Sequence, residues 1–334
     1  MMWMSAFPTR PCLTQRWSGH LALAMIGLML TVGSVAVSAA GPEAFEPPVT
    51  CLCISADGEY VVDGSQAGIR IRRWHDLAVE AEHPIPCAQI HDCRISADQS
   101  RLVVVGGDPG QTSFVGVYAW PDVSEIWSRQ FGEDVLYAGS FAQSGDVLAL
   151  AGHDHGVYLV NADNGEPQSI LRGHSKPATD VRILNDSRTL LSCSIDQTIR
   201  VWNYQTGSIV RSLNNHTQPV IAMAVRPVTE GLPMIASVGE DRTVRLWQPT
   251  IGRLVRFCRL KSPANALTWT NTGDRIIAGC RDGCVYSIVA DTLEVRTYPD
   301  ISSGWVNSIA AHPKQSSIVV GTSTGRVRKI LLDH

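Results

Sequence analysis

Short apolar runs of five or six residues recur along the chain after residue 48, and clusters of Gly, Asp, Asn or Ser separate them. Examples are YVVDGS, LVVVGG, VLALAG, TLLSCS and RIIAGC. Runs of this length, rich in Val, Ile and Leu and bounded by turn residues, are typical of β-strands. No stretch after residue 40 shows sustained helical periodicity. The pattern therefore predicts an all-β protein.

The strands belong to a larger repeat. CSIDQTIRVWN at residues 193–203 returns as VGEDRTVRLWQ at residues 238–248, with the acid, the arginine and the tryptophan in step. Copies recur every 40 to 45 residues, and seven can be aligned. In the other copies the position of Trp202 and Trp247 is taken by Trp120, Val160, Ile288 and Ile330, with a weaker copy near Arg72 to Trp74.

Each copy reads as four short strands joined by tight turns. Four antiparallel strands at this period are the signature of a propeller blade. The order of strands and turns in residues 41–334 closely resembles that of the WD-repeat family, most clearly in the fourth and fifth copies. The resemblance implies a seven-bladed β-propeller of four-stranded antiparallel blades.

The resemblance also implies a hydrogen-bonded chain of His, Ser, Asp and Trp inside each well-matched blade. The expected structural tetrads are His174, Ser192, Asp196 and Trp202, and His216, Ser237, Asp241 and Trp247. The physical reason is that a buried indole nitrogen needs an acceptor and a buried carboxylate needs donors. The third, sixth and seventh copies have Val or Ile in the tryptophan position, so we expect packing alone to hold those blades together.

Residues 1–40 differ from the rest of the chain. Arg10 and Arg16 are followed by an uncharged apolar run from Leu21 to Ala40 that ends in small residues. A positive flank, an apolar core and a small-residue exit predict an export signal, with an uncleaved membrane anchor as the alternative. The predicted organisation is therefore a signal peptide at 1–40 and a propeller at 41–334. The predicted protein is a bacterial-type member that is periplasmic, cell-envelope or extracellular, and it touches a membrane only if the segment stays uncleaved.

The net charge and the short sequence motifs limit the partners and activities that the sequence supports. Removal of residues 1–40 with their two arginines changes the formal charge from −3 to −5. A mildly acidic chain without a basic run argues against nucleic acid as a partner. GTSTG at 321–325 matches a serine-hydrolase motif but lacks the following helix that this motif needs. We find no cofactor motif and no zinc-type or calcium-type ligand spacing, so no metal or cofactor is expected.

Two local features leave chemical alternatives open. His153 and His155 could share a metal ion, although the intervening Asp154 occupies the same position as Asp196. Cys280 and Cys284 bracket a tight turn and could form a disulfide across it. The other cysteines occupy mostly apolar strand positions, where Cys is an ordinary small core residue.

The sequence favours a non-catalytic scaffold for protein–protein interaction, because a propeller offers wide faces and no built-in reactive group. The alternative is an exported propeller enzyme, or a protein that binds a small ligand or metal in the central channel. No nucleophile–base pair supports that alternative.

The expected partner-binding face combines the turns between second and third strands with the residues before each first strand. The candidates are Tyr137, His153, Lys176, Ile195, Glu240, Arg281 and Trp305. Trp305 is the strongest of these candidates, because nothing in the repeat requires a tryptophan at that position. Trp and Arg are also enriched in binding hot spots. The alternative is that Trp305 packs over the channel mouth or against a neighbouring blade.

A last prediction concerns ring closure. The seventh copy has no residues for a fourth strand, so we expect Ala44 to Glu46 to pair beside Val327 to Leu331. Proline is tolerated on such an edge strand.

Overall fold

The structure is a computed structural model that describes residues 46–227, 231–299 and 301–332. The chain divides into two units, Met1–Glu43 and Ala44–His334, and the description below concerns the second. The predicted signal segment at residues 1–40 lies outside the described residues. Within the described ranges, no helix combines the length and the apolar character needed to cross a bilayer.

The described chain forms 27 strands and one 3₁₀ turn (η1, Pro249–Ile251), and four antiparallel strands make up each of six sheets. The first strands are β1 (Cys51–Ile54), β5 (Gln89–Ile95), β9 (Leu136–Phe141), β13 (Ala178–Ile183), β17 (Val220–Val225), β21 (Ala264–Trp269) and β25 (Val306–Ala311). The second strands are β2 (Tyr60–Ser65), β6 (Arg101–Asp108), β10 (Val147–Gly152), β14 (Thr189–Ser194), β18 (Ile235–Gly239), β22 (Arg275–Cys280) and β26 (Ser317–Thr322).

The third strands are β3 (Gly68–Arg73), β7 (Thr112–Ala119), β11 (Gly156–Asn161), β15 (Ile199–Asn203), β19 (Thr243–Gln248), β23 (Val285–Val289) and β27 (Val327–Leu331). The fourth strands are β4 (Val79–His83), β8 (Ser124–Arg129), β12 (Pro167–Arg172), β16 (Ser208–Leu213), β20 (Arg253–Arg259) and β24 (Val295–Tyr298). The prediction of an all-β, seven-bladed propeller is confirmed.

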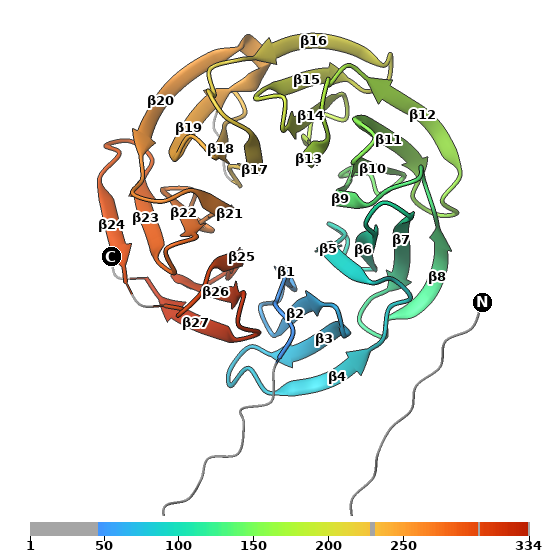
Figure 1. The fold of residues 1–334 in the computed structure, drawn as a ribbon, viewed down its shortest axis with the longest axis horizontal. Coiled ribbons are helices and arrows are strands. Elements are labelled where there is room, and N and C mark those ends of the chain that lie inside the picture. The colour runs from blue at the N-terminus through green and yellow to red at the C-terminus, as the bar shows by residue number, and fades with distance from the viewer. Residues whose placement is uncertain (1–45, 228–230, 300, 333–334) are drawn as a thin grey trace, which may run out of the picture. The chain divides into compact units, whose positions relative to one another are not determined.

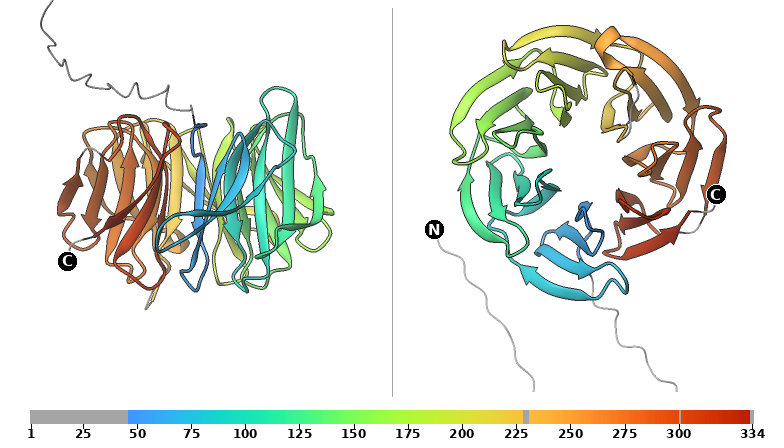
Figure 2. Two further views of the ribbon diagram at one scale, coloured as in Figure 1. Left: turned by 90° about the horizontal axis from the view of Figure 1, so that it is seen from below. Right: turned by 180° about the vertical axis from the view of Figure 1, so that it is seen from behind.

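The seven sheets stand around a central axis with the first strands innermost and the fourth strands on the outer rim (Figure 1). Seen from the side, the strands run roughly along the ring axis, so turns gather on two opposite faces (Figure 2). Successive strands of a blade pair only with their sequence neighbours. The chain therefore moves outward from the first strand to the fourth strand of each blade. The two faces that carry the turns are available for binding.

The core lies between the blades rather than inside one compact centre. Among the residues that the structure describes, there are seven buried apolar clusters, one between each pair of neighbouring blades. Second strands contribute most fully to them: β10, for example, reads VLALAG and is buried from Leu148 onward. A strand flanked by neighbours on both faces is expected to be apolar at successive positions rather than alternating. This explains the uninterrupted apolar runs in the sequence.

The ring closes where the last blade meets the first. The Val49 N–H donates to the Thr322 carbonyl oxygen at 3.1 Å, and the Trp74 and His312 rings lie 4.5 Å apart. The Trp74 indole nitrogen donates to the Gln315 side chain at 3.3 Å. Residues more than 200 positions apart are thus joined by apolar and polar contacts.

The seventh blade is three-stranded in the described part of the chain, where β27 pairs only with β26. Of its predicted fourth strand, Ala44 and Phe45 lie outside the described residues. Glu46 is described, and it lies so close to Gly325 that an added Cβ there would be 2.8 Å from the Glu46 carbonyl oxygen. Pairing of this segment with β27 stays a prediction.

Deletion of residues 41–48 is expected to lower the melting temperature clearly, by about 2–4 °C for each kcal/mol of lost contact. The physical reason is that the deletion would expose the β27 edge that this segment is predicted to cover, and would remove Glu46 from beside Arg70. Thermal unfolding of the deleted and full-length proteins, followed by circular dichroism, checks this. An unchanged melting temperature would mean that the last blade is three-stranded.

Candidate partner-binding face

The fourth blade contains a buried chain of hydrogen bonds. The Trp202 indole nitrogen donates to Ser192 Oγ at 2.8 Å, and Ser192 Oγ lies 2.7 Å from His174 Nε2. His174 Nδ1 lies 2.9 Å from the Asp196 carboxylate. Because an ionised carboxylate only accepts, His174 donates at Nδ1, and its neutral Nε2 accepts from Ser192. Each hydrogen-bond donor among these four side chains therefore has one acceptor.

The fifth blade repeats this geometry. Trp247 donates to Ser237 Oγ at 2.9 Å, Ser237 Oγ lies 2.8 Å from His216 Nε2, and His216 Nδ1 lies 2.9 Å from Asp241. Both tryptophans and both serines are buried. The two tetrads anchor the turn between the second and third strands to the interior of their blades, and so they support the face above them.

Acid is expected to destabilise both tetrads. Burial raises the pKa of Asp196, but hydrogen bonds from His174 and Thr198 outweigh it and hold that pKa well below its ordinary value of 3.8; Asp241 behaves alike with His216 and Thr243. A depressed pKa contributes stability that is present above the ordinary pKa and is lost as the pH falls below it. The urea midpoint should therefore fall steeply below about pH 4.

The Asp241→Asn variant tests this assignment. It should be less stable than the wild type at pH 6 and should show a shallower loss between pH 5 and about pH 2.5. Asp163→Asn, which changes an exposed acid, is the control and should follow the wild-type curve. Parallel curves for Asp241→Asn and the wild type would show that this carboxylate does not carry the acid dependence.

Blades three and six are not held by packing alone, which corrects the expectation from sequence. The Tyr158 hydroxyl donates to Asp154 at 2.6 Å, and the Tyr286 hydroxyl donates to Asp282 at 2.8 Å. Each pair links the turn acid directly to the third strand, whereas the histidine of a tetrad links it to a serine on the second strand. The signal was present in the sequence as Asp-x-Gly-x-Tyr in DHGVY and in the spacing of DGCVY, with the tyrosine four residues after the acid. Asp154 therefore stabilises the turn between the second and third strands of blade three.

The second blade also differs from the expectation. Trp202 pairs across its strand with Leu190, the second residue of β14. The matching position in the second blade is Tyr118, which pairs with Leu102, and not Trp120, which follows the end of β7. The assignment of Trp120 was therefore wrong by two residues. The strands β6 and β7 have eight residues each, but their extra residues lie near the turn that joins them and not near Tyr118.

The turns and blade entries of one face are joined by a repeated backbone contact. In the fourth, fifth and sixth blades, the turn residue donates its N–H to the carbonyl of the proline before the first strand. The pairs are Ile195 to Pro177 at 3.1 Å, Glu240 to Pro219 at 2.9 Å and Arg281 to Pro263 at 3.1 Å. His153 to Val135 at 3.0 Å and Ser323 to Trp305 at 2.9 Å extend the pattern to blades three and seven. This contact brings the two groups of predicted face residues together.

Three of the predicted residues form a continuous line across blades five, six and seven. The Arg281 guanidinium binds both carboxylate oxygens of Glu240, one at 3.0 Å, and also the Asn265 side chain at 2.8 Å. Its central carbon lies 5.2 Å from the centroid of the Trp305 ring. Trp305 is 51% exposed, and its ring packs in part against Arg281 of the neighbouring sixth blade. Glu240, Arg281 and Trp305 therefore form a surface on which the Trp305 ring is exposed and is held in place by Arg281.

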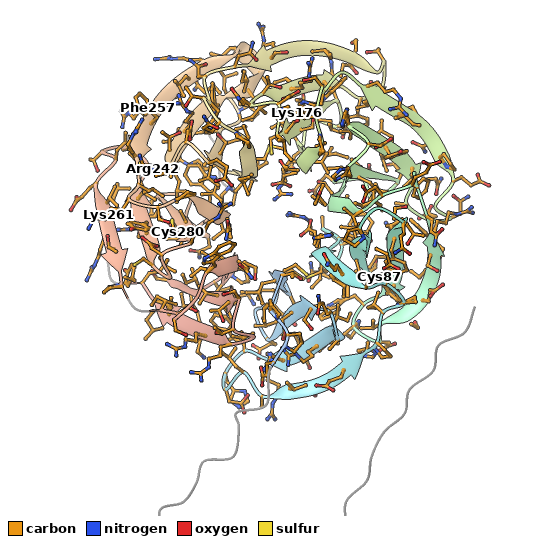
Figure 3. All side chains as sticks on the ribbon, in the orientation of Figure 1. Cys87, Lys176, Arg242, Phe257, Lys261 and Cys280 are labelled. Carbon is orange, nitrogen blue, oxygen red and sulfur yellow. The ribbon has the colours of Figure 1, made fainter. Side chains whose placement is uncertain are left out.

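The other predicted face residues lie apart from this line. The Tyr137 hydroxyl is 2.8 Å from His153 Nδ1, and His153 Nε2 is 3.5 Å from Asp134. Lys176 is exposed at the entry to the fourth blade (Figure 3), and its carbonyl accepts from Ser194 Oγ. Ile195 is half-buried. Tyr137 and His153 form a second, smaller group on blade three.

First strands line a central channel of about 710 Å³. On its wall Asp92 binds Arg94 at 2.7 Å, Arg94 lies 3.8 Å from Asp180, and Asp180 binds Arg182 at 2.5 Å. Asp180 also accepts the Met223 N–H at 2.9 Å. The sequence reasoning missed this network, although Asp-x-Arg occurs on both β5 and β13. It ties blades two, four and five together, and its acids are engaged with arginines.

Two observations within the described residues bear on the open alternatives for metal and disulfide chemistry. No group of three or more His, Cys, Asp or Glu side chains there has the arrangement of a metal site. Cys280 is a buried thiol, and the Cys284 sulfur lies 3.9 Å from the Asp282 carbonyl oxygen. The Cys280–Cys284 disulfide is therefore not formed.

Comparison with known proteins adds to this geometry. Residues 165–203 and 207–248, which contain the two tetrads, match the model of the WD domain, G-beta repeat. The U5 small nuclear ribonucleoprotein 40 kDa protein of Dictyostelium discoideum is 25% identical over 190 residues, which are 56% of this chain and 53% of that protein. The pre-mRNA-splicing factor cwf17 of Schizosaccharomyces pombe is 27% identical over 195 residues, 58% of this chain and 54% of its own.

The apoptotic protease-activating factor 1 of Rattus norvegicus is 29% identical over 241 residues, 72% of this chain but 18% of that protein. The chain thus spans about half the length of the first two proteins and less than a fifth of the third. These matches support a β-propeller built from WD repeats.

The comparison contradicts the predicted location. Two of these relatives are named for a small nuclear ribonucleoprotein and for pre-mRNA splicing, and all three come from eukaryotes. The prediction of an exported protein, whether periplasmic, cell-envelope or extracellular, is therefore wrong. The expectation of a bacterial-type member gains no support from them either. The apolar pattern of residues 1–40 misled the reasoning because composition alone cannot distinguish an export signal from other apolar segments.

Proposed function

We propose that this WD-repeat β-propeller is a non-catalytic scaffold that binds other proteins through the face carrying Glu240, Arg281 and Trp305. The observation that carries the proposal is the exposed Trp305 ring, which is held by a guanidinium that two other blades fix in place. A large aromatic side chain kept in one position loses little conformational freedom on binding. Such anchors dominate the energetics of protein–protein interfaces.

The surroundings of the anchor fit a protein partner. Arg281 and Glu240 are each roughly one-quarter exposed, so they form a polar border beside the aromatic ring. An aromatic centre with a polar border is the usual anatomy of a protein–protein interface. The described channel acids, by contrast, are engaged with arginines, and this supports a binding role over acid–base chemistry.

The double variant Trp305→Ala with Arg281→Ala is expected to retain its melting temperature and to lose the partner recovered by affinity capture from the native host. Loss of an aromatic and an arginine anchor typically weakens binding by about 2 kcal/mol or more each. Quantitative mass spectrometry of captured proteins, compared with the wild type, measures the effect.

The matched control is Arg188→Ala with Gln205→Ala, which removes two side chains from turns on the opposite face of blade four. That variant should recover the same partners as the wild type. Unfolding of the Trp305 and Arg281 double variant, or survival of its binding, would exclude this face as the docking site.

A further inference from the structure

The outermost strand of blade five carries a dense stripe of cations. Arg253, Arg256 and Arg259 lie on β20, Lys261 follows it, and all four are exposed. No acidic residue occurs from residue 249 to residue 261. The sequence reasoning found no basic run because apolar residues separate these cations. The fold gathers them on the rim of a chain whose net charge is negative.

These cations differ from Arg70 and Arg72 of the first blade, which line a groove beside β27. Arg70 and Arg72 both bind the buried Asp63, and Arg70 lies 4.0 Å from Glu46. None of the four cations of the β20 stripe forms an ion pair within residues 46–227, 231–299 or 301–332. Arg242 adds a further exposed cation beside them, because its carbonyl accepts the Leu260 N–H at 2.7 Å (Figure 3).

The two sides of β20 have different chemistry. Arg253 and Arg256 pair with Gln248 and Leu246 of β19 and so project from one side of the sheet. Phe257 and Arg259 pair with Arg245 and Thr243 and project from the other. Phe257 is 53% exposed, although the Arg245 guanidinium carbon lies 5.2 Å from its ring centroid. One side thus offers two cations and the other offers an aromatic ring next to a cation.

The strand also has an open edge, because within the described chain β20 pairs only with β19. An open edge presents both N–H donors and C=O acceptors. A peptide main chain satisfies both kinds of group, whereas the phosphate oxygens of a nucleic acid only accept. An edge flanked by cations therefore favours a peptide over a nucleic acid.

We propose that the edge of β20 binds an extended acidic peptide, which adds to blade five as a fifth strand. Side chains of an added strand alternate between the two sides of the sheet. Acidic side chains of the peptide meet Arg253 and Arg256, and the apolar side chains between them meet Phe257. The residues that carry the proposal, Arg253, Arg256 and Phe257, lie outside the line of Glu240, Arg281 and Trp305. The inference therefore stands or falls independently of the function proposed above.

The test measures binding of a fluorescein-labelled peptide to the full-length protein by fluorescence anisotropy. The probe has about eight residues in which glutamate alternates with leucine or valine, matching the alternation of a strand. Arg253→Glu with Arg256→Glu should weaken binding by about tenfold or more, and added salt should weaken the wild-type complex. The control, Arg129→Glu with Arg188→Glu, makes the same change of net charge elsewhere and should stay within about twofold of the wild type.

Two further probes separate strand addition from simple charge attraction. A peptide of the same composition with its glutamates grouped at one end should bind more weakly, as should one with alternate backbone amides methylated. Trp305→Ala with Arg281→Ala should leave peptide binding unchanged. Equal binding of the N-methylated peptide, equal weakening by the control variant, or comparable binding of a ten-nucleotide oligothymidine at the same site would overturn the proposal.

Discussion

Replacing Asp180 by alanine is expected to lower the free energy of unfolding by about 3–5 kcal/mol. Asp180 is 4% exposed and holds Arg182, Arg94 and the Met223 N–H on the channel wall. Burial raises the pKa of Asp180, with the two arginines opposing that rise. Removal of the carboxylate would leave the largely buried Arg182 guanidinium and the buried Met223 N–H without this partner. Urea unfolding at pH 7 measures the change.

The control is Asp163→Ala, which removes the 74% exposed partner of Arg101 and should cost about 0–1 kcal/mol. The double variant Asp180→Ala with Arg182→Ala should recover part of the loss, because it removes the uncompensated charge as well. A loss no larger for Asp180→Ala than for Asp163→Ala would show that the channel network does not hold the blades together.

Replacing Ser237 by alanine is expected to cost about 2–5 kcal/mol, more than almost any other exchange of so few atoms. The single hydroxyl accepts from Trp247 and bonds His216, and both partners are buried. Each buried polar atom left without a partner costs about 1–3 kcal/mol. Ser128→Ala, on the exposed strand β8, is the control and should change stability by less than about 0.5 kcal/mol.

A double-mutant cycle identifies the cause of that loss. In the Ser237→Ala background, Trp247→Phe should cost less than it does in the wild type, because the orphaned indole N–H has gone. Strict additivity of the two changes would show that the serine acts by packing and not by its hydrogen bond to the tryptophan.

The period of the sequence was sufficient to predict the architecture because every blade needs four short strands of similar length. The register of paired strands was harder to predict in a blade that lacks the repeated tryptophan. Trp120 was assigned to the tryptophan position because it is a conspicuous residue, whereas the pairing of Leu102 with its partner places Tyr118 there. A search for a repeated tryptophan does not detect a tyrosine in its place.

The candidate site was predictable only in part. Arg281 and Trp305 were both assigned to one face, since turns and blade entries recur in fixed order. Their contact, and the link to Glu240, depends on which blades are neighbours and on how far each side chain reaches. The channel network escaped the reasoning because Asp180 and Arg94 come from blades that are not adjacent in the sequence. Such pairings appear only when the ring closes.

The repeated backbone contact between turns and blade entries has a consequence for protein engineering. At positions 153, 195, 240, 281 and 323 the fold uses the main-chain N–H of the residue, which every amino acid except proline supplies. The side chains at these positions are therefore open to replacement without loss of that contact. Combinatorial libraries that vary these five positions would diversify one rigid surface across five blades, so the propeller could serve as a display scaffold.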